Sequence, residues 1–82
     1  MQTQTMKAMS HAVPADIIMD ALGILFENDI AFDVEGIDEE DTTILIRTST
    51  NPKLRRHRDV LDNLKEMIKD FKYYREETHI SN

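Results

Sequence analysis

The 82-residue chain contains no cysteine, no tryptophan and only two glycines. The absence of cysteine excludes disulfide bonds and thiolate metal sites. Two glycines are too few for the glycine-rich loop of a P-loop nucleotide site or for a dinucleotide fingerprint. None of the serines, which are Ser10, Ser49 and Ser81, lies in the G-x-S-x-G setting of an activated nucleophile. The composition therefore predicts a protein that is not an enzyme and that holds no cofactor.

Long apolar runs are also missing, and the longest are far shorter than the ~18 residues that a membrane-spanning helix needs. Residues 1–10 lack the charged segment followed by an apolar segment that marks a signal peptide. We therefore expect a cytoplasmic protein without a membrane partner.

Charge is abundant but unevenly distributed along the chain. Residues 1–46 hold one basic and ten acidic residues, a net charge of −9, whereas residues 47–82 hold nine basic and six acidic residues, a net charge of +3; the sum is the formal −6 of the whole chain. A chain of this size buries little more than ~60% of its unfolded surface. Small domains without disulfides often complete their core by oligomerising, so we expect a homodimer with the chain itself as a partner.

Hydrophobic periodicity predicts a helix in the first half of the chain. Residues 1–13 show no period and are predicted to be a flexible leader. Pro14 suits the first turn of a helix, and Asn28 suits a left-handed cap at its end. The apolar residues between them recur on one helical face: Ile17, Ile18, Ala21, Leu22 and Leu25.

Two segments of alternating polarity follow, at residues 30–35 and 42–48, with a turn at 36–41 between them. Alternation with period two and a short connection predict an antiparallel hairpin. Asn51 as N-cap and Pro52 at the first helical position then predict a second helix over residues 52–75. Its apolar seam has spacings of 3 and 4: Leu54, His57, Leu61, Leu64, Ile68, Phe71. Residues 76–82 are predicted to be a flexible tail.

The predicted fold class is α+β, a single αββα domain over residues 14–75. An antiparallel β-hairpin would be packed by two helices. Because an isolated hairpin is marginal in water, we expect two hairpins to join edge to edge as a four-stranded sheet in the homodimer.

A basic cluster at the start of the second helix is the first candidate site: Lys53, Arg55, Arg56, His57 and Arg58. Arginine side chains beside the free N–H groups of a helix start suit an anion such as phosphate or the nucleic-acid backbone. The competing interpretation pairs them with the protein's own carboxylates, from Asp59, Asp62 or the acidic turn of a partner subunit. A sequence pI near 4.9 favours the second interpretation.

Metal binding has little support in the sequence. Six carboxylates fall within residues 33–41, but they lack the spacing of a calcium loop and read as a charged hairpin turn. The three histidines, His11, His57 and His79, have no second histidine or cysteine at ligand spacing. His57 falls on the apolar seam, where it is either a pH-sensitive group or a packed boundary residue. We predict no metal site.

Apolar and aromatic residues beyond a single core give a second candidate surface. Tyr73 and Tyr74 lie near the end of the second helix, where they either stack on nucleic-acid bases or cover a partner. Ile37 and Leu45, together with Phe26, would mark a protein interface if they cluster.

The sequence therefore leads to one hypothesis and one alternative. The first is a small non-catalytic interaction or regulatory protein that acts as a homodimer and binds a protein partner of undetermined identity. The alternative is phosphate or nucleic-acid binding through the basic start of the second helix. An enzyme is the least supported class.

Overall fold

A computed structural model describes the backbone of residues 6–80 and the side chains of residues 6–73. The elements follow the order β1 (Lys7–Pro14), η1 (a 3₁₀ turn, Ala15–Ile17), α1 (Ile18–Glu27), β2 (Ala31–Asp38), β3 (Thr43–Thr50) and α2 (Arg55–Ile80). The strands form one antiparallel sheet in the order β1-β3-β2. The predicted α+β class is confirmed, but the described chain contains a third strand that the αββα order omitted.

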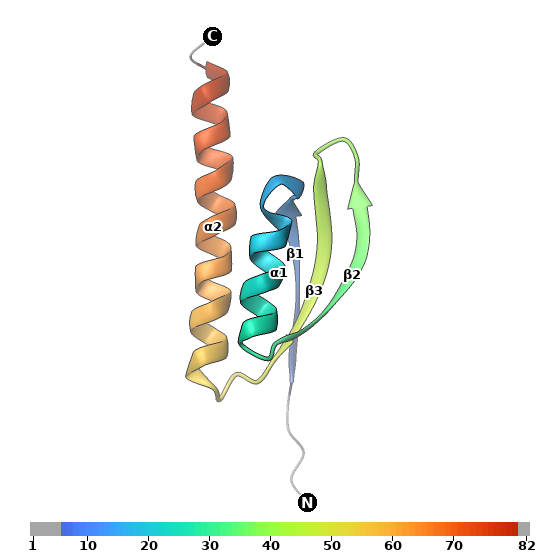
Figure 1. The fold of residues 1–82 in the computed structure, drawn as a ribbon, viewed down its shortest axis with the longest axis vertical. Coiled ribbons are helices and arrows are strands. Elements are labelled where there is room, and N and C mark those ends of the chain that lie inside the picture. The colour runs from blue at the N-terminus through green and yellow to red at the C-terminus, as the bar shows by residue number, and fades with distance from the viewer. Residues whose placement is uncertain (1–5, 81–82) are drawn as a thin grey trace, which may run out of the picture.

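Helix α1 lies over one face of the sheet, and the longer α2 lies beside it on the β1 side (Figure 1). The turn between β2 and β3 and the start of α2 lie at opposite ends of the molecule (Figure 1). Seven buried residues form the core between the helices and the sheet: Val13, Ala21, Leu25, Ile30, Ile46, Val60 and Leu64. No helix in the described part of the chain is long and apolar enough to span a membrane.

Strand β1 corrects the predicted leader, because Lys7 to Val13 pair with β3 along their whole length. Residues 1–5 lie outside the described part of the chain. Val13 is completely buried and His11 nearly so, whereas Ala8, Ser10 and Ala12 are exposed. The segment thus alternates with period two, as a half-buried strand does. Alanine and serine have low strand propensity, and this composition hid the pattern.

The hairpin of β2 and β3 is confirmed, but its strands are longer than predicted. A bulge between Val34 and Gly36 inserts one extra residue in β2. A bulge reverses the inside–outside alternation, so the period-two pattern ended early in the sequence. The turn is consequently shorter than residues 36–41, and the Asp38 carboxylate accepts hydrogen bonds from the backbone N–H groups of Glu40 (3.1 Å) and Asp41 (3.3 Å).

Helix α1 ends at Glu27, directly before the predicted cap residue Asn28, but its start and the conformation of that cap differ from the prediction. Pro14 closes β1 and precedes the 3₁₀ turn, so that α1 begins at Ile18. Asn28 has φ −107° and is not the left-handed residue; that conformation belongs to Asp29, with φ 58°. The Asn28 side chain instead donates to the carbonyl oxygen of Ile24 at 2.8 Å, which satisfies a carbonyl of the last turn.

Helix α2 begins at Arg55 rather than at Pro52. The Asn51 side chain accepts a hydrogen bond from the backbone N–H of Lys53 at 3.0 Å, which makes a local turn and not a helix cap. The Leu54 carbonyl accepts the first helical bonds, from His57 (3.1 Å) and Arg58 (3.3 Å). At the other end, α2 continues to Ile80, so residues 76–80 are helical rather than part of a tail. Residues 81–82 lie outside the described part of the chain.

Candidate functional site

The basic start of α2 is exposed, apart from its histidine. The side chains of Lys53, Arg55, Arg56 and Arg58 face solvent, whereas His57 is only 5% exposed. Nδ1 of His57 accepts a hydrogen bond from the backbone N–H of Asn51 at 3.1 Å. Because a backbone N–H can only donate, Nδ1 must be unprotonated in this arrangement. His57 therefore holds the turn before α2 and is not arranged to meet an external anion.

Among these four exposed cations, the described ion pairs involve only Arg56, which lies 3.9 Å from a carboxylate oxygen of Asp29. The predicted pairs of Arg55 and Arg58 with Asp59 and Asp62 do not occur among the described residues. The acidic turn between β2 and β3 lies at the opposite end of the molecule from the start of α2 (Figure 1). Arg55, Arg56 and Asp59 line one side of a groove of about 720 Å³ between α1 and α2, where positive and negative charge are mixed.

A second groove, of about 540 Å³, lies between β1 and α2. Its lining combines two consecutive residues of β1 with one flank of α2: His11, Ala12, Lys65, Ile68, Lys69, Lys72 and Tyr73. The lysines stand at spacings of four and three, which places them on one side of a helix. No carboxylate is among the described lining residues, so this groove has a single sign of charge.

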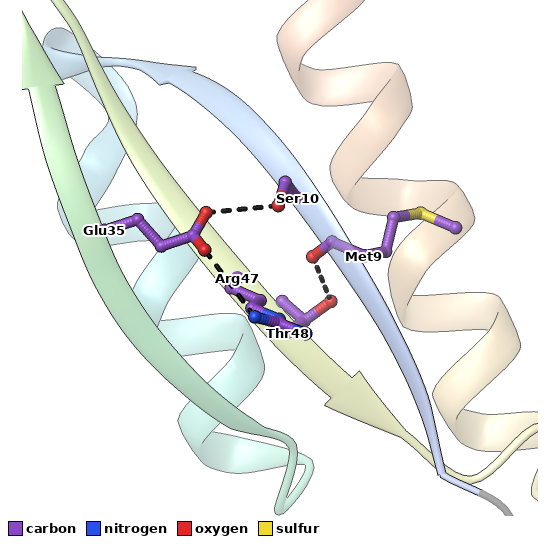
Figure 2. Close-up of polar contacts among 5 residues, drawn as sticks. All are labelled: Met9, Ser10, Glu35, Arg47 and Thr48. Atoms are coloured by element: carbon purple, nitrogen blue, oxygen red, sulfur yellow. Dashed lines mark hydrogen bonds and ion pairs between the residues drawn. The ribbon is translucent and has the colours of Figure 1, made fainter.

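His11 is the one nearly buried polar residue among the described residues that line this groove. The Thr48 hydroxyl donates to the Met9 carbonyl oxygen at 3.3 Å, so its oxygen accepts from Nε2 of His11 at 3.1 Å. Figure 2 shows Thr48 and Met9 on neighbouring strands, with α2 beside β1. Burial lowers the pKa of His11, and the positive charge of Lys65 lowers it further. Lys65 and His11 line the same groove.

The opposite face of the sheet, which α1 leaves uncovered, carries a polar contact between three strands. Glu35 accepts a hydrogen bond from the Ser10 hydroxyl at 3.1 Å, and its other oxygen lies 3.9 Å from Arg47 (Figure 2). Glu35 thereby connects the two edge strands across β3. These residues are exposed, and exposed ion pairs contribute at most about 1 kcal/mol to stability, so the cluster is a weak surface contact between the strands.

An apolar surface covers the flank of α1 that faces away from α2. Met19 and Phe26 are more than three-quarters exposed, and their spacing of seven places them on one side of the helix. Ile24, on the other side of α1, lines the groove toward α2. On β2, Val34 (57% exposed) and Ile37 (69%) pair with Ile46 and Ile44, whose side chains contribute to the core under α1.

Opposite residues in an antiparallel pair share a face, so Val34 and Ile37 point to the same side of the sheet as α1. Strand β2 lies beyond α1 as seen from α2 (Figure 1). We call Met19, Phe26, Val34 and Ile37 the α1–β2 surface. Of the interface residues predicted from sequence, Phe26 and Ile37 belong to this surface, whereas Leu45 lies on the opposite face of the sheet. Tyr73 lines the β1–α2 groove, and the side chain of Tyr74 lies outside the described residues.

Sequence reasoning missed the two features that organise these surfaces. The lysines at 65, 69 and 72 show a helical spacing that was available in the sequence. His11 and Ala12 gave no such signal because they fell in a segment without recognisable strand propensity. Within the described residues, no group of three or more potential ligands is arranged to hold a metal ion.

Comparisons with protein-family models, with curated proteins and with solved structures found no match to this chain.

Proposed function

We propose that the protein is a small, non-catalytic interaction or regulatory protein that acts as a homodimer, with the α1–β2 surface as the contact between the two copies. The observation that carries this proposal is the exposure of four large apolar side chains, which helix spacing and strand register place on one side of the molecule. Exposed apolar surface that is concentrated on one side marks interaction sites. A two-fold axis would bring the same surface of each copy together, as in most homo-oligomers.

Two further features support a second copy as the occupant. The chain is small and has no cysteine to stabilise it, which favours completion of the core by association. The first 46 residues carry a net charge of −9 and the remainder +3, so oppositely charged regions of two copies can attract each other. The non-catalytic role is supported by the absence of a recognisable nucleophile setting in the sequence.

Strand β1 changes the number of strands in the dimer sheet that we expected from two hairpins. Each chain contributes three strands, so a dimer joined edge to edge through β2 would contain six. In that arrangement the α1–β2 surfaces of both copies would line one continuous trough. On the opposite face of that sheet, Asp33 and Glu35 of both copies would approach each other, which opposes edge pairing. Packing through the apolar faces avoids this repulsion.

Sedimentation equilibrium over a wide range of protein concentrations tests the proposal. We expect a mass of twice the 9.6 kDa chain, and we expect Phe26→Glu combined with Ile37→Glu to give the mass of one chain. Leu45→Glu is the matched control because Leu45 lies on the opposite face of the sheet and is also partly exposed. A wild-type protein that stays monomeric at about 100 μM, a concentration at which even a weak ~10 μM dimer is mostly assembled, would overturn the proposal.

Phosphate or nucleic-acid binding at the start of α2 is the alternative. The exposure of Lys53, Arg55 and Arg58 supports it, whereas the carboxylates of Asp29 and Asp59 beside Arg56 oppose it. Fluorescence anisotropy of labelled oligonucleotides at low and high salt discriminates the two functions. Salt-sensitive binding that is lost in the double variant Arg55→Ala and Arg56→Ala would favour the alternative.

A further inference from the structure

The free edge of β1 and the lysine-lined flank of α2 face the same groove, and this juxtaposition is independent of the α1–β2 surface. Among the described residues, β1 pairs with β3 alone, so its other edge has no strand partner. The groove is lined by Ala12 from β1 and by Lys65, Lys69 and Lys72 from α2. The two sides therefore offer different chemistry: backbone hydrogen-bonding groups and positive charge.

The hydrogen-bond pattern identifies which backbone groups point into the free edge. In an antiparallel pair, residues alternate between those that bond the neighbouring strand and those whose N–H and C=O point away from it. The N–H of Ala15 donates to the Thr42 carbonyl oxygen at 3.0 Å. The odd-numbered residues of β1 therefore direct their backbone N–H and C=O groups toward β3. Ala8, Ser10 and Ala12 direct theirs outward, toward the free edge.

Two observations agree with this assignment. Hydroxyl groups from β3 donate to the carbonyl oxygens of Lys7 and Met9, so both carbonyls face β3. Pro14, which has no N–H, occupies an outward position of the same strand, where no ladder bond is lost. The three outward residues before it are alanine and serine, whose small side chains allow another backbone to approach closely.

We propose that the β1–α2 groove binds an extended acidic peptide segment of a partner protein, which adds to the free edge of β1 as a further strand. Strand addition to an exposed sheet edge obtains affinity from main-chain hydrogen bonds and specificity from the side chains around it. Here those side chains are Lys65, Lys69 and Lys72, without a carboxylate among the described lining residues. Carboxylates on one side of the added strand would meet these ammonium groups.

The apolar part of the lining extends the complementarity. Ile68 and the ring of Tyr73 stand among the lysines on α2. Because the side chains of a strand alternate between two faces, a segment of alternating acidic and apolar residues would direct all its carboxylates to the α2 side. The methylene groups of these side chains could also pack on Ile68 and Tyr73 there, while the apolar side chains would lie on the opposite face. We expect nucleic acid to bind less well, because its backbone cannot pair with the edge of β1 and the protein carries a net charge of −6.

Fluorescence anisotropy with a defined probe tests the proposal. The probe is a labelled, end-blocked hexapeptide of alternating glutamate and valine, and the control probe replaces each glutamate with lysine. We expect the acidic probe to bind with an affinity that falls as salt rises, and the basic probe not to bind. The double variant Lys65→Glu and Lys69→Glu should weaken binding by at least about tenfold, since two attractions become repulsions. Lys53→Glu, at an exposed lysine outside the groove, should leave the affinity unchanged.

The backbone part of the proposal needs its own variants. Ala12→Pro removes one outward N–H without removing a bond to β3, and it should weaken binding at least about fivefold, in line with the loss of one hydrogen bond and of close approach. Circular dichroism and the urea midpoint establish that this variant folds. A probe with N-methylated peptide bonds tests the same point from the ligand side, because it leaves the protein unaltered and should not bind.

Three results would overturn the proposal. The first is the absence of acidic-probe binding at low salt. The second is equal binding of the N-methylated probe, which would mean that the lysines act without the strand edge. The third is tighter binding of a single-stranded oligonucleotide of equal charge that also depends on Lys65 and Lys69. The peptide titrations are repeated with the double variant Phe26→Glu and Ile37→Glu, in which the groove residues are unchanged. Unchanged peptide binding by this variant would show that the groove acts independently of self-association.

Discussion

Nε2 of His11 lies 3.1 Å from the hydroxyl oxygen of Thr48, a residue 37 positions later in the chain. This contact joins β1 to β3 within the buried layer, and the Thr48 hydroxyl continues it to the Met9 carbonyl oxygen. A buried polar group without a partner is costly. The pair therefore provides a specific reason for β1 to adopt its observed register against β3.

The pH dependence of stability follows from the lowered pKa of His11. Burial and the charge of Lys65 hold the folded-state value below the ordinary 6.5, so the unfolded chain binds more protons at mildly acidic pH. The free energy of unfolding should be unaffected by this group above about pH 6.5 and should fall as the pH drops from there through the folded-state pKa. Urea titrations at about pH 7.5 and 5.5, on either side of the ordinary histidine value, measure the loss.

The control for this prediction is His11→Gln, whose side-chain amide can also donate to Thr48 but does not titrate. The variant should lose less stability than the wild type over the same interval, even though the other histidines are still present. An equal loss in both proteins would show that His11 is not the group responsible.

Removal of the His57 ring should weaken the start of α2. In His57→Leu, the backbone N–H of Asn51 loses its acceptor, and we expect about 1–2 kcal/mol of destabilisation from the unmet donor. Arg58→Leu changes the next residue, which is exposed, and should alter stability by no more than about 0.5 kcal/mol. Urea denaturation of both variants measures the difference. Similar small effects in the two would contradict the structural role assigned to His57.

Thr42→Gly should stabilise the protein. Thr42 has φ 55°, a left-handed conformation that is unfavourable for a β-branched residue and accessible to glycine. We expect a gain of up to about 1 kcal/mol, because relief of this strain exceeds the added flexibility of the unfolded chain. Thermal denaturation measures the gain as a rise in Tm.

Thr43→Gly, one position later, is the matched control because Thr43 is a buried strand residue. That change should lower Tm, since glycine weakens a strand. A fall in Tm for both variants would contradict the conformation described for Thr42.

Periodicity predicted much of the fold because it reports burial directly. Leu25 in α1 and Leu64 in α2 occupy apolar positions of regular helical patterns, and both are completely buried. Ile46 shows the corresponding period-two signal in β3. The end of α1 next to Asn28 was also predicted, whereas the helix starts were not. Asn51 and Pro52 resemble a helix start, but the contact of Asn51 with His57 delays α2 to Arg55.

The candidate surfaces were less predictable than the core. The basic residues at 53–58 stood out in the sequence because four of them fall within six positions, whereas Lys65, Lys69 and Lys72 are separated by acidic and apolar residues. Only the position of β1 beside α2 makes those lysines one wall of a groove. Ile37 was recognised as surplus apolar surface, but the bulge after Val34 determines the face on which it lies.

The sequence by itself determined the α+β class, the two apolar helical faces and the antiparallel hairpin, because the spacing of nearby residues predicts each of them. It also determined the opposite charges of the two halves, which follow from residue counts. Tertiary structure alone decided that residues 7–14 form a strand. Their alanines and serine favour no strand on their own, and the segment gains its hydrogen bonds and buries Val13 only when β3 is beside it. The same pairing creates the free edge that faces α2, so the groove proposed as a binding site exists only in the folded chain.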